Sequence, residues 1–90
     1  MLRLRAVVHG DVQGVGFRFF LIDEARALGV RGWVRNRPDG SVELTAEGDR
    51  AQLDALLSAA GRGPRHARVT EVEVEWGEAT GELGAFHAVH

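Results

Sequence analysis

GDVQGVGFRF, residues 10–19, lies between a segment of alternating apolar residues and a segment with helical periodicity. Three of these ten residues are glycines, which let a backbone bend sharply and approach a ligand closely. Arg18 comes at the start of the helical segment. Backbone N–H groups at a helix N-terminus attract anions, and a guanidinium beside them adds a second anion-binding group. The stretch therefore predicts a loop that binds a small anion such as a phosphate.

The segments on either side of this loop have different periodicities. Apolar residues alternate with polar ones over residues 2–9, which predicts a strand with one buried face. From Phe17 the apolar residues recur at helical spacing, and Gly29 suits the left-handed conformation that ends many helices. Residues 17–28 are therefore predicted to form a helix that begins at the loop.

A turn signal separates two further alternating segments. Residues 30–36 and 41–47 flank Pro38-Asp39-Gly40, in which proline fixes φ and Asp-Gly tolerates a positive φ. These segments are predicted to form a hairpin. Glu43 and Glu47 are expected to point outward from its second strand. The arginines with which they are expected to pair are Arg31, Arg35 and Arg37.

The rest of the chain predicts a second helix and two more strands. Asp49 and Gln52 have the spacing of a capping box at a helix N-terminus. The apolar stripe of this helix is Leu53, Leu56, Leu57 and Ala60. The glycines and proline of residues 61–64 end it, residues 69–76 form a strand, and residues 85–89 form an edge strand. The inward residues of the longer strand are Val72, Val74 and Trp76.

The order β-α-β-β-α-β predicts an α+β fold, the ferredoxin-like βαββαβ sandwich, in which an antiparallel sheet carries two helices on one face. Residues 1–90 are expected to form a single domain. Right-handed crossovers make the first two strands parallel, with the third between them. The end of the first strand, the start of the first helix and the end of the second strand then share one edge of the sheet. The glycine-rich loop, Arg18 and Asn36 are therefore predicted to converge.

Composition narrows the classes of partner and cofactor. The net charge of −2 predicts no general affinity for nucleic acid or anionic membranes. The absence of cysteine excludes disulfides, thiolate metal sites and cysteine nucleophiles, and the four histidines have no metal-like spacing. No signal peptide or long apolar run is found, which predicts a cytoplasmic protein. We expect a monomer.

Two motifs together resemble those of the acylphosphatase family. The first is residues 10–18, GDVQGVGFR, and the second is residues 32–36, GWVRN, followed by residues 39–42, DGSV. The resemblance covers essentially the whole chain. The tail departs from the family pattern, because Phe86 is followed by His87-Ala88-Val89-His90 rather than by an aromatic-rich strand.

The resemblance implies an enzyme that needs no metal or cofactor. Its partner is a small acyl phosphate, which it hydrolyses to a carboxylate and inorganic phosphate. It implies that Arg18 binds the phosphoryl group and that Asn36 positions the attacking water. The phosphate-binding set is Gln13, Gly14, Val15, Gly16, Phe17 and Arg18. Within that set Gln13 is expected to shape the loop rather than react, and Phe17 is expected to contribute packing.

Two other functions are compatible with the pattern. One is a non-catalytic ferredoxin-like module that binds an anion or RNA, although the predicted sheet lacks the clustered aromatic residues on which bases stack. The other is an acylphosphatase-like domain of a larger maturation enzyme that uses carbamoyl phosphate. The start at Met1 and the complete order of elements favour a free-standing protein.

Overall fold

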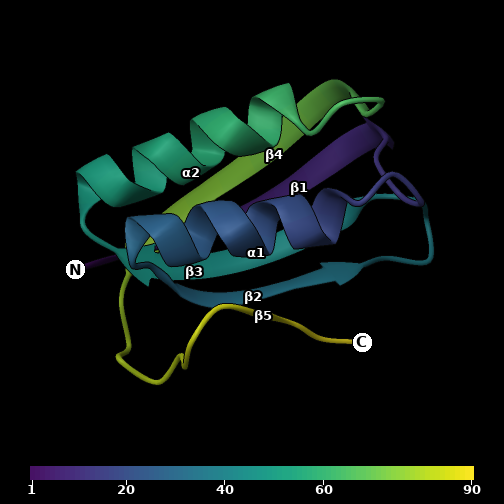
Figure 1. Cartoon of the computed structure of the whole chain (residues 1–90). Coiled ribbons are helices and arrows are strands. Elements are labelled where there is room, and N and C mark those ends of the chain that lie inside the picture. The colour runs from purple at the N-terminus through teal and green to yellow at the C-terminus, as the bar shows by residue number, and fades with distance from the viewer.

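Both helices lie on one face of a five-stranded sheet in the computed structural model, which describes residues 1–90 (Figure 1). The elements are β1 (Leu2–Asp11), α1 (Phe17–Leu28), β2 (Arg31–Asn36), β3 (Val42–Gly48), α2 (Arg50–Arg62), β4 (Arg68–Glu78) and β5 (His87–Ala88). The predicted ferredoxin-like arrangement is confirmed. Neither helix combines the length and the apolar run that crossing a membrane requires.

The strand order is β4-β1-β3-β2-β5. β1 and β2 both run antiparallel to β3, so they are parallel to each other with β3 between them, as predicted. β5 runs parallel to β2, which makes the sheet mixed; the expectation of a wholly antiparallel sheet is wrong at this edge. The reason is that β4 ends at the same end of the sheet as the one at which β2 begins. The segment after β4 therefore reaches the start of β2 first and pairs with it in the same direction.

The first strand is longer than its alternation predicts, because Gly10 and Asp11 belong to β1 rather than to the loop. The register between β1 and β4 shifts between His9 and Gly10, and Gly10 has a φ of 125°. A Cβ at Gly10 would lie 2.0 Å from the backbone oxygen of Arg68. This glycine therefore permits a β-bulge and the close approach of β4.

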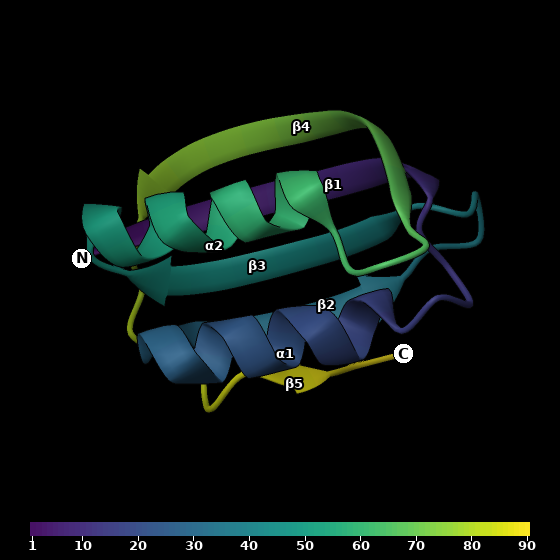
Figure 2. The same ribbon diagram turned by 45° about the horizontal axis from the view of Figure 1, so that its top comes forward.

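The core fills the space between the sheet and the two helices (Figure 2). Its fully buried residues include Leu4, Val8, Phe17, Leu21, Val34, Leu44, Leu53 and Leu56. Leu57 is only partly buried. Val74 and Trp76, which were expected to point into the core, are 38% and 37% exposed. They share the helix-covered face but belong to β4, which lies at the rim of the sheet beyond α2.

Local signals set the ends of both helices. Gly29 adopts the predicted left-handed conformation after α1. The predicted capping box at α2 is confirmed: Asp49 accepts from Gln52 N at 2.8 Å, and Gln52 Oε1 accepts from Asp49 N at 2.9 Å. Gln52 Nε2 also donates to the Leu28 carbonyl at 2.8 Å, which joins the start of α2 to the end of α1. α2 continues through Gly61 and Arg62 and ends at Gly63.

The face of the sheet without helices carries ion pairs across β3. Glu43 and Glu47 are only 4% and 5% exposed, because β3 is the central strand and arginines of its neighbours cover it. Glu43 accepts from Arg5 and Arg35, each at 2.9 Å. Glu47 accepts from Arg3 at 2.8 Å. The pairing expected with Arg35 is confirmed, whereas Arg31 and Arg37 pair with neither glutamate.

These ion pairs predict a loss of stability in acid. Burial raises the pKa of Glu43, but hydrogen bonds from Arg35 and Arg5 outweigh it and hold the pKa below the ordinary value of 4.5. A lowered folded-state pKa means that Glu43 stabilises the fold fully above that ordinary value. The contribution declines below it and is lost as pH falls through the folded-state pKa. We expect Glu43→Gln to cost about 1–2 kcal/mol of unfolding free energy at pH 7.

Urea denaturation at several pH values checks this prediction. The difference between the unmodified protein and Glu43→Gln should shrink as pH falls below 4.5. Glu75→Gln is the control, because Glu75 is 73% exposed and its contact with Arg5 is long, at 3.4 Å. A difference that stays constant from pH 7 into the acid range would contradict the prediction.

Candidate active site

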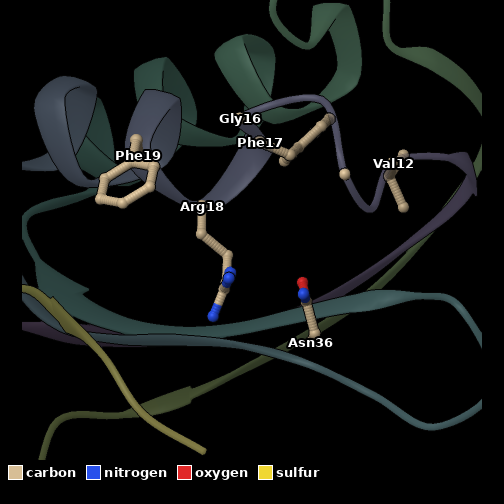
Figure 3. A pocket seen from close by; sticks show the side chains of 7 residues that line it. Val12, Gly16, Phe17, Arg18, Phe19 and Asn36 are labelled. Atoms are coloured by element: carbon tan, nitrogen blue, oxygen red, sulfur yellow. The ribbon is translucent and has the colours of Figure 1, made fainter.

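A pocket of about 210 Å³ lies at the sheet edge where β1 and β2 end and α1 begins (Figure 3). It brings together a continuous segment that follows β1 and one residue at the end of β2. Its lining residues are Val12, Gly14, Gly16, Phe17, Arg18, Phe19 and Asn36. The loop and Asn36, which are far apart in the sequence, thus border one cavity.

The loop leaves the N-terminus of α1 open to the pocket. Gly14 and Gly16 have φ of 77° and 76°, the left-handed region that favours glycine. No side chain caps the helix, and its first turn contains no acidic residue. The first N–H groups of a helix have no partner within the helix. The positive end of α1 is therefore available to an anion.

Arg18 presents a guanidinium that has no protein partner. Its side chain is half-buried and extends from the first turn of α1 into the pocket that Asn36 also lines (Figure 3). Six other arginines, in contrast, are held by hydrogen bonds or ion pairs: Arg3, Arg5, Arg26, Arg35, Arg37 and Arg50. A free guanidinium can bind two oxygens of one phosphate at once.

Asn36 presents a carboxamide from the opposite wall of the pocket. Its Oδ1 is buried and has no hydrogen-bond partner in the protein. Leaving a buried acceptor unpaired costs about 1–3 kcal/mol, so such groups are rare in folded proteins. In Figure 3 the carboxamide points from β2 toward the loop. Its unpaired oxygen is suited to a ligand or a bound water.

Two residues of the predicted phosphate-binding set do not line the pocket. Val15 is partly buried and packs against the core. Gln13 donates through Nε2 to the carbonyls of Arg37 and Ser41, at 2.8 and 2.9 Å. Arg37 directly follows Asn36, so the side chain of Gln13 fastens the loop to the strand end that carries Asn36. That contact agrees with the expectation that Gln13 shapes the loop.

Phe17 and Phe19 contribute to the pocket in different ways. The ring of Phe17 belongs to the core and is 2% exposed, as its predicted packing role requires, so its backbone is the part available to a ligand. Phe19 is 72% exposed and lines the pocket. Neither Phe19 nor Val12 belongs to the predicted phosphate-binding set, although both lie within residues 10–19. Two features of the sequence could have indicated Phe19: it directly follows Arg18, and it lies off the apolar stripe of α1.

The lining residues do not include a carboxylate, a thiol or an imidazole. No group of three or more histidine, aspartate or glutamate side chains suited to hold a metal ion occurs in the structure. The chemistry that the pocket offers is therefore that of one guanidinium, one carboxamide and the N–H groups of a helix start. These groups bind an anion and orient a polar molecule beside it.

Known proteins with similar sequences, and one of the two similar solved structures reported below, are described as acylphosphatases. The family model described as acylphosphatase matches residues 4–88. An acylphosphatase of Anaeromyxobacter sp. strain Fw109-5 is 54% identical over 90 residues, covering 100% of this chain and 97% of that protein. The crystal structure of acylphosphatase from Bacillus subtilis matches with a TM-score of 0.96, 39% identity and 100% coverage of both chains. The structure of full-length HypF in its phosphate- and nucleotide-bound form matches with a TM-score of 0.87 and 26% identity, over all of this chain and 12% of that one.

Proposed function

The chain belongs to the acylphosphatase family, and from this premise we propose that it hydrolyses acyl phosphates in the pocket between the loop and β2 without a metal ion. Membership of the family makes it an enzyme that acts on acyl phosphates. The observation that carries the assignment of the site is the pair of unpartnered side chains, Arg18 and Asn36, that face one cavity at an open helix N-terminus.

In the proposed complex the phosphoryl group lies at the start of α1. The N–H groups of the loop and the first helical turn, from Gly14 to Arg18, bind its equatorial oxygens, and the guanidinium of Arg18 binds two of them. Charge on these oxygens is what a phosphoryl-transfer enzyme must stabilise. Because these donors are cationic or belong to a helix start, they supply the neutralisation that a metal ion supplies in other phosphoryl-transfer enzymes.

The attacking water is held by Asn36. A carboxamide has both donor and acceptor atoms, so it can orient a water but cannot act as a strong base. The water oxygen attacks phosphorus, and the bond between phosphorus and the acyl oxygen breaks. The electron pair leaves on the carboxylate, a stable anion that needs no acid to depart. The proton of the water passes to an oxygen of the phosphoryl group, which gives inorganic phosphate.

A turnover assay tests the proposal. We expect the purified protein to release inorganic phosphate from benzoyl phosphate at the same rate with and without a chelator of divalent cations. Absence of turnover would refute the proposed activity, and a shift of the melting temperature by phosphate without turnover would instead favour an anion-binding module. Activity that a chelator removes and Mg²⁺ restores would refute metal independence alone.

A further inference from the structure

Phe19 is an exposed aromatic residue at the mouth of the pocket. The exposed large apolar side chains are Met1 and Phe19, at 81% and 72%, and the less exposed Val74 and Trp76. Of these, only Phe19 lines the pocket. The aromatic pair that packs at this end of α1 is formed by Phe17 and Phe20, with ring centroids 6.1 Å apart, and does not include Phe19. The ring of Phe19 is therefore free to contact a ligand.

The geometry of the proposed reaction places the acyl group near this ring. In phosphoryl transfer the attacking and leaving oxygens lie roughly in line on opposite sides of phosphorus. If water lies beside Asn36, the acyl group leaves on the side of the phosphoryl group away from Asn36. Figure 3 shows Phe19 beside Arg18, on the side of Arg18 that is away from Asn36.

The other lining residues offer little to an acyl group. Val12 and Phe17 are 1% and 2% exposed, so neither presents much apolar surface. Arg18 is the only charged side chain of the lining, and the phosphoryl group occupies it in the proposed complex. An acyl group that carries a carboxylate or a second phosphate therefore finds no cation of its own in the pocket.

We propose that Phe19 is a specificity-determining residue that packs against the acyl group and favours acyl phosphates with an aromatic or bulky apolar acyl group. This proposal rests on the proposed function, because it needs the phosphoryl group at Arg18 and the water at Asn36. Stacking of a ring on Phe19 stabilises the bound substrate, whereas an acetyl group is too small to cover the ring. The site thus favours a substrate with an apolar acyl group at one end and a dianionic phosphate at the other.

The test compares two substrates, benzoyl phosphate and acetyl phosphate, in the unmodified protein, Phe19→Ala and Phe19→Tyr. For each substrate kcat/KM of the variant is divided by that of the unmodified protein, which removes the intrinsic reactivity of the substrate. We expect Phe19→Ala to lose about three- to tenfold more kcat/KM toward benzoyl phosphate than toward acetyl phosphate, mainly through KM. Phe19→Tyr, which keeps a ring, should retain the preference.

Trp76→Ala is the matched control, because it removes an exposed aromatic ring from β4 outside the pocket. It should change neither ratio, and the high exposure of Phe19 predicts that Phe19→Ala folds as the unmodified protein does. Equal losses toward both substrates in Phe19→Ala, or no loss toward either, would overturn the assignment of Phe19 while the proposed function stands. Absence of turnover of both substrates by the unmodified protein would overturn the two proposals together.

Discussion

Replacement of Arg18 by alanine is expected to lower kcat/KM for benzoyl phosphate by about 10²–10³-fold, the usual cost of removing one preorganised group that stabilises transition-state charge. The stability of the fold should not change, because Arg18 forms no hydrogen bond or ion pair within the protein. Inorganic phosphate, as a product, should inhibit the variant much more weakly than the unmodified enzyme. Steady-state kinetics and thermal denaturation measure these effects.

Arg18→Lys separates the role of charge from that of geometry. Lysine keeps the positive charge but lacks the planar fork that binds two oxygens at once. It should restore part of the affinity for phosphate and leave kcat/KM well below that of the unmodified enzyme. The control is Arg31→Ala, because Arg31 is also without an ion pair but lies at the start of β2, away from the pocket. Full activity of Arg18→Ala would remove Arg18 from the proposed site.

The position of the site could be predicted from local sequence patterns together with one general rule on the handedness of crossovers. The glycine-rich loop and the hairpin are local signals in the sequence. The rule that crossovers are right-handed then places the ends of β1 and β2 at one edge of the sheet. That is sufficient to bring Arg18 and Asn36 to one pocket without any knowledge of side-chain contacts.

The features that were missed depend on neighbours remote in the sequence. Gly10 reads as a loop glycine until β4 is placed beside it, where its missing Cβ admits the backbone of Arg68. Glu43 was expected to point outward and to pair with an arginine near the second strand of the hairpin. Its burial depends in addition on Arg5 of β1, which covers it from the other side. Val74 has the alternation of a core residue but belongs to a strand that the helices leave partly uncovered. Periodicity gives the face of a residue but not the position of its strand in the sheet.

Asn36→Ala is expected to lower kcat by about 10²–10³-fold with a smaller effect on binding. Arg18→Ala, in contrast, is expected to weaken phosphate binding strongly. The reason is that Asn36 is proposed to orient the water rather than to hold the phosphoryl group. Inhibition by inorganic phosphate should therefore stay within a few-fold of that of the unmodified enzyme. Asn36→Asp is the companion variant, because it keeps the shape but adds a negative charge that should repel phosphate.

Asn36→Ala should leave the fold about as stable as before, because the Asn36 side chain forms no hydrogen bond within the protein that the substitution could break. A purely structural asparagine gives the opposite result, since its removal breaks hydrogen bonds and lowers stability. Urea denaturation and kinetics on the same sample therefore distinguish the two roles. A variant with weaker phosphate binding and unchanged kcat would make Asn36 a phosphate ligand, and full activity of the Arg18→Ala/Asn36→Ala double variant would refute the site. Unchanged or increased stability together with loss of turnover would mean that Asn36 serves the reaction rather than the fold.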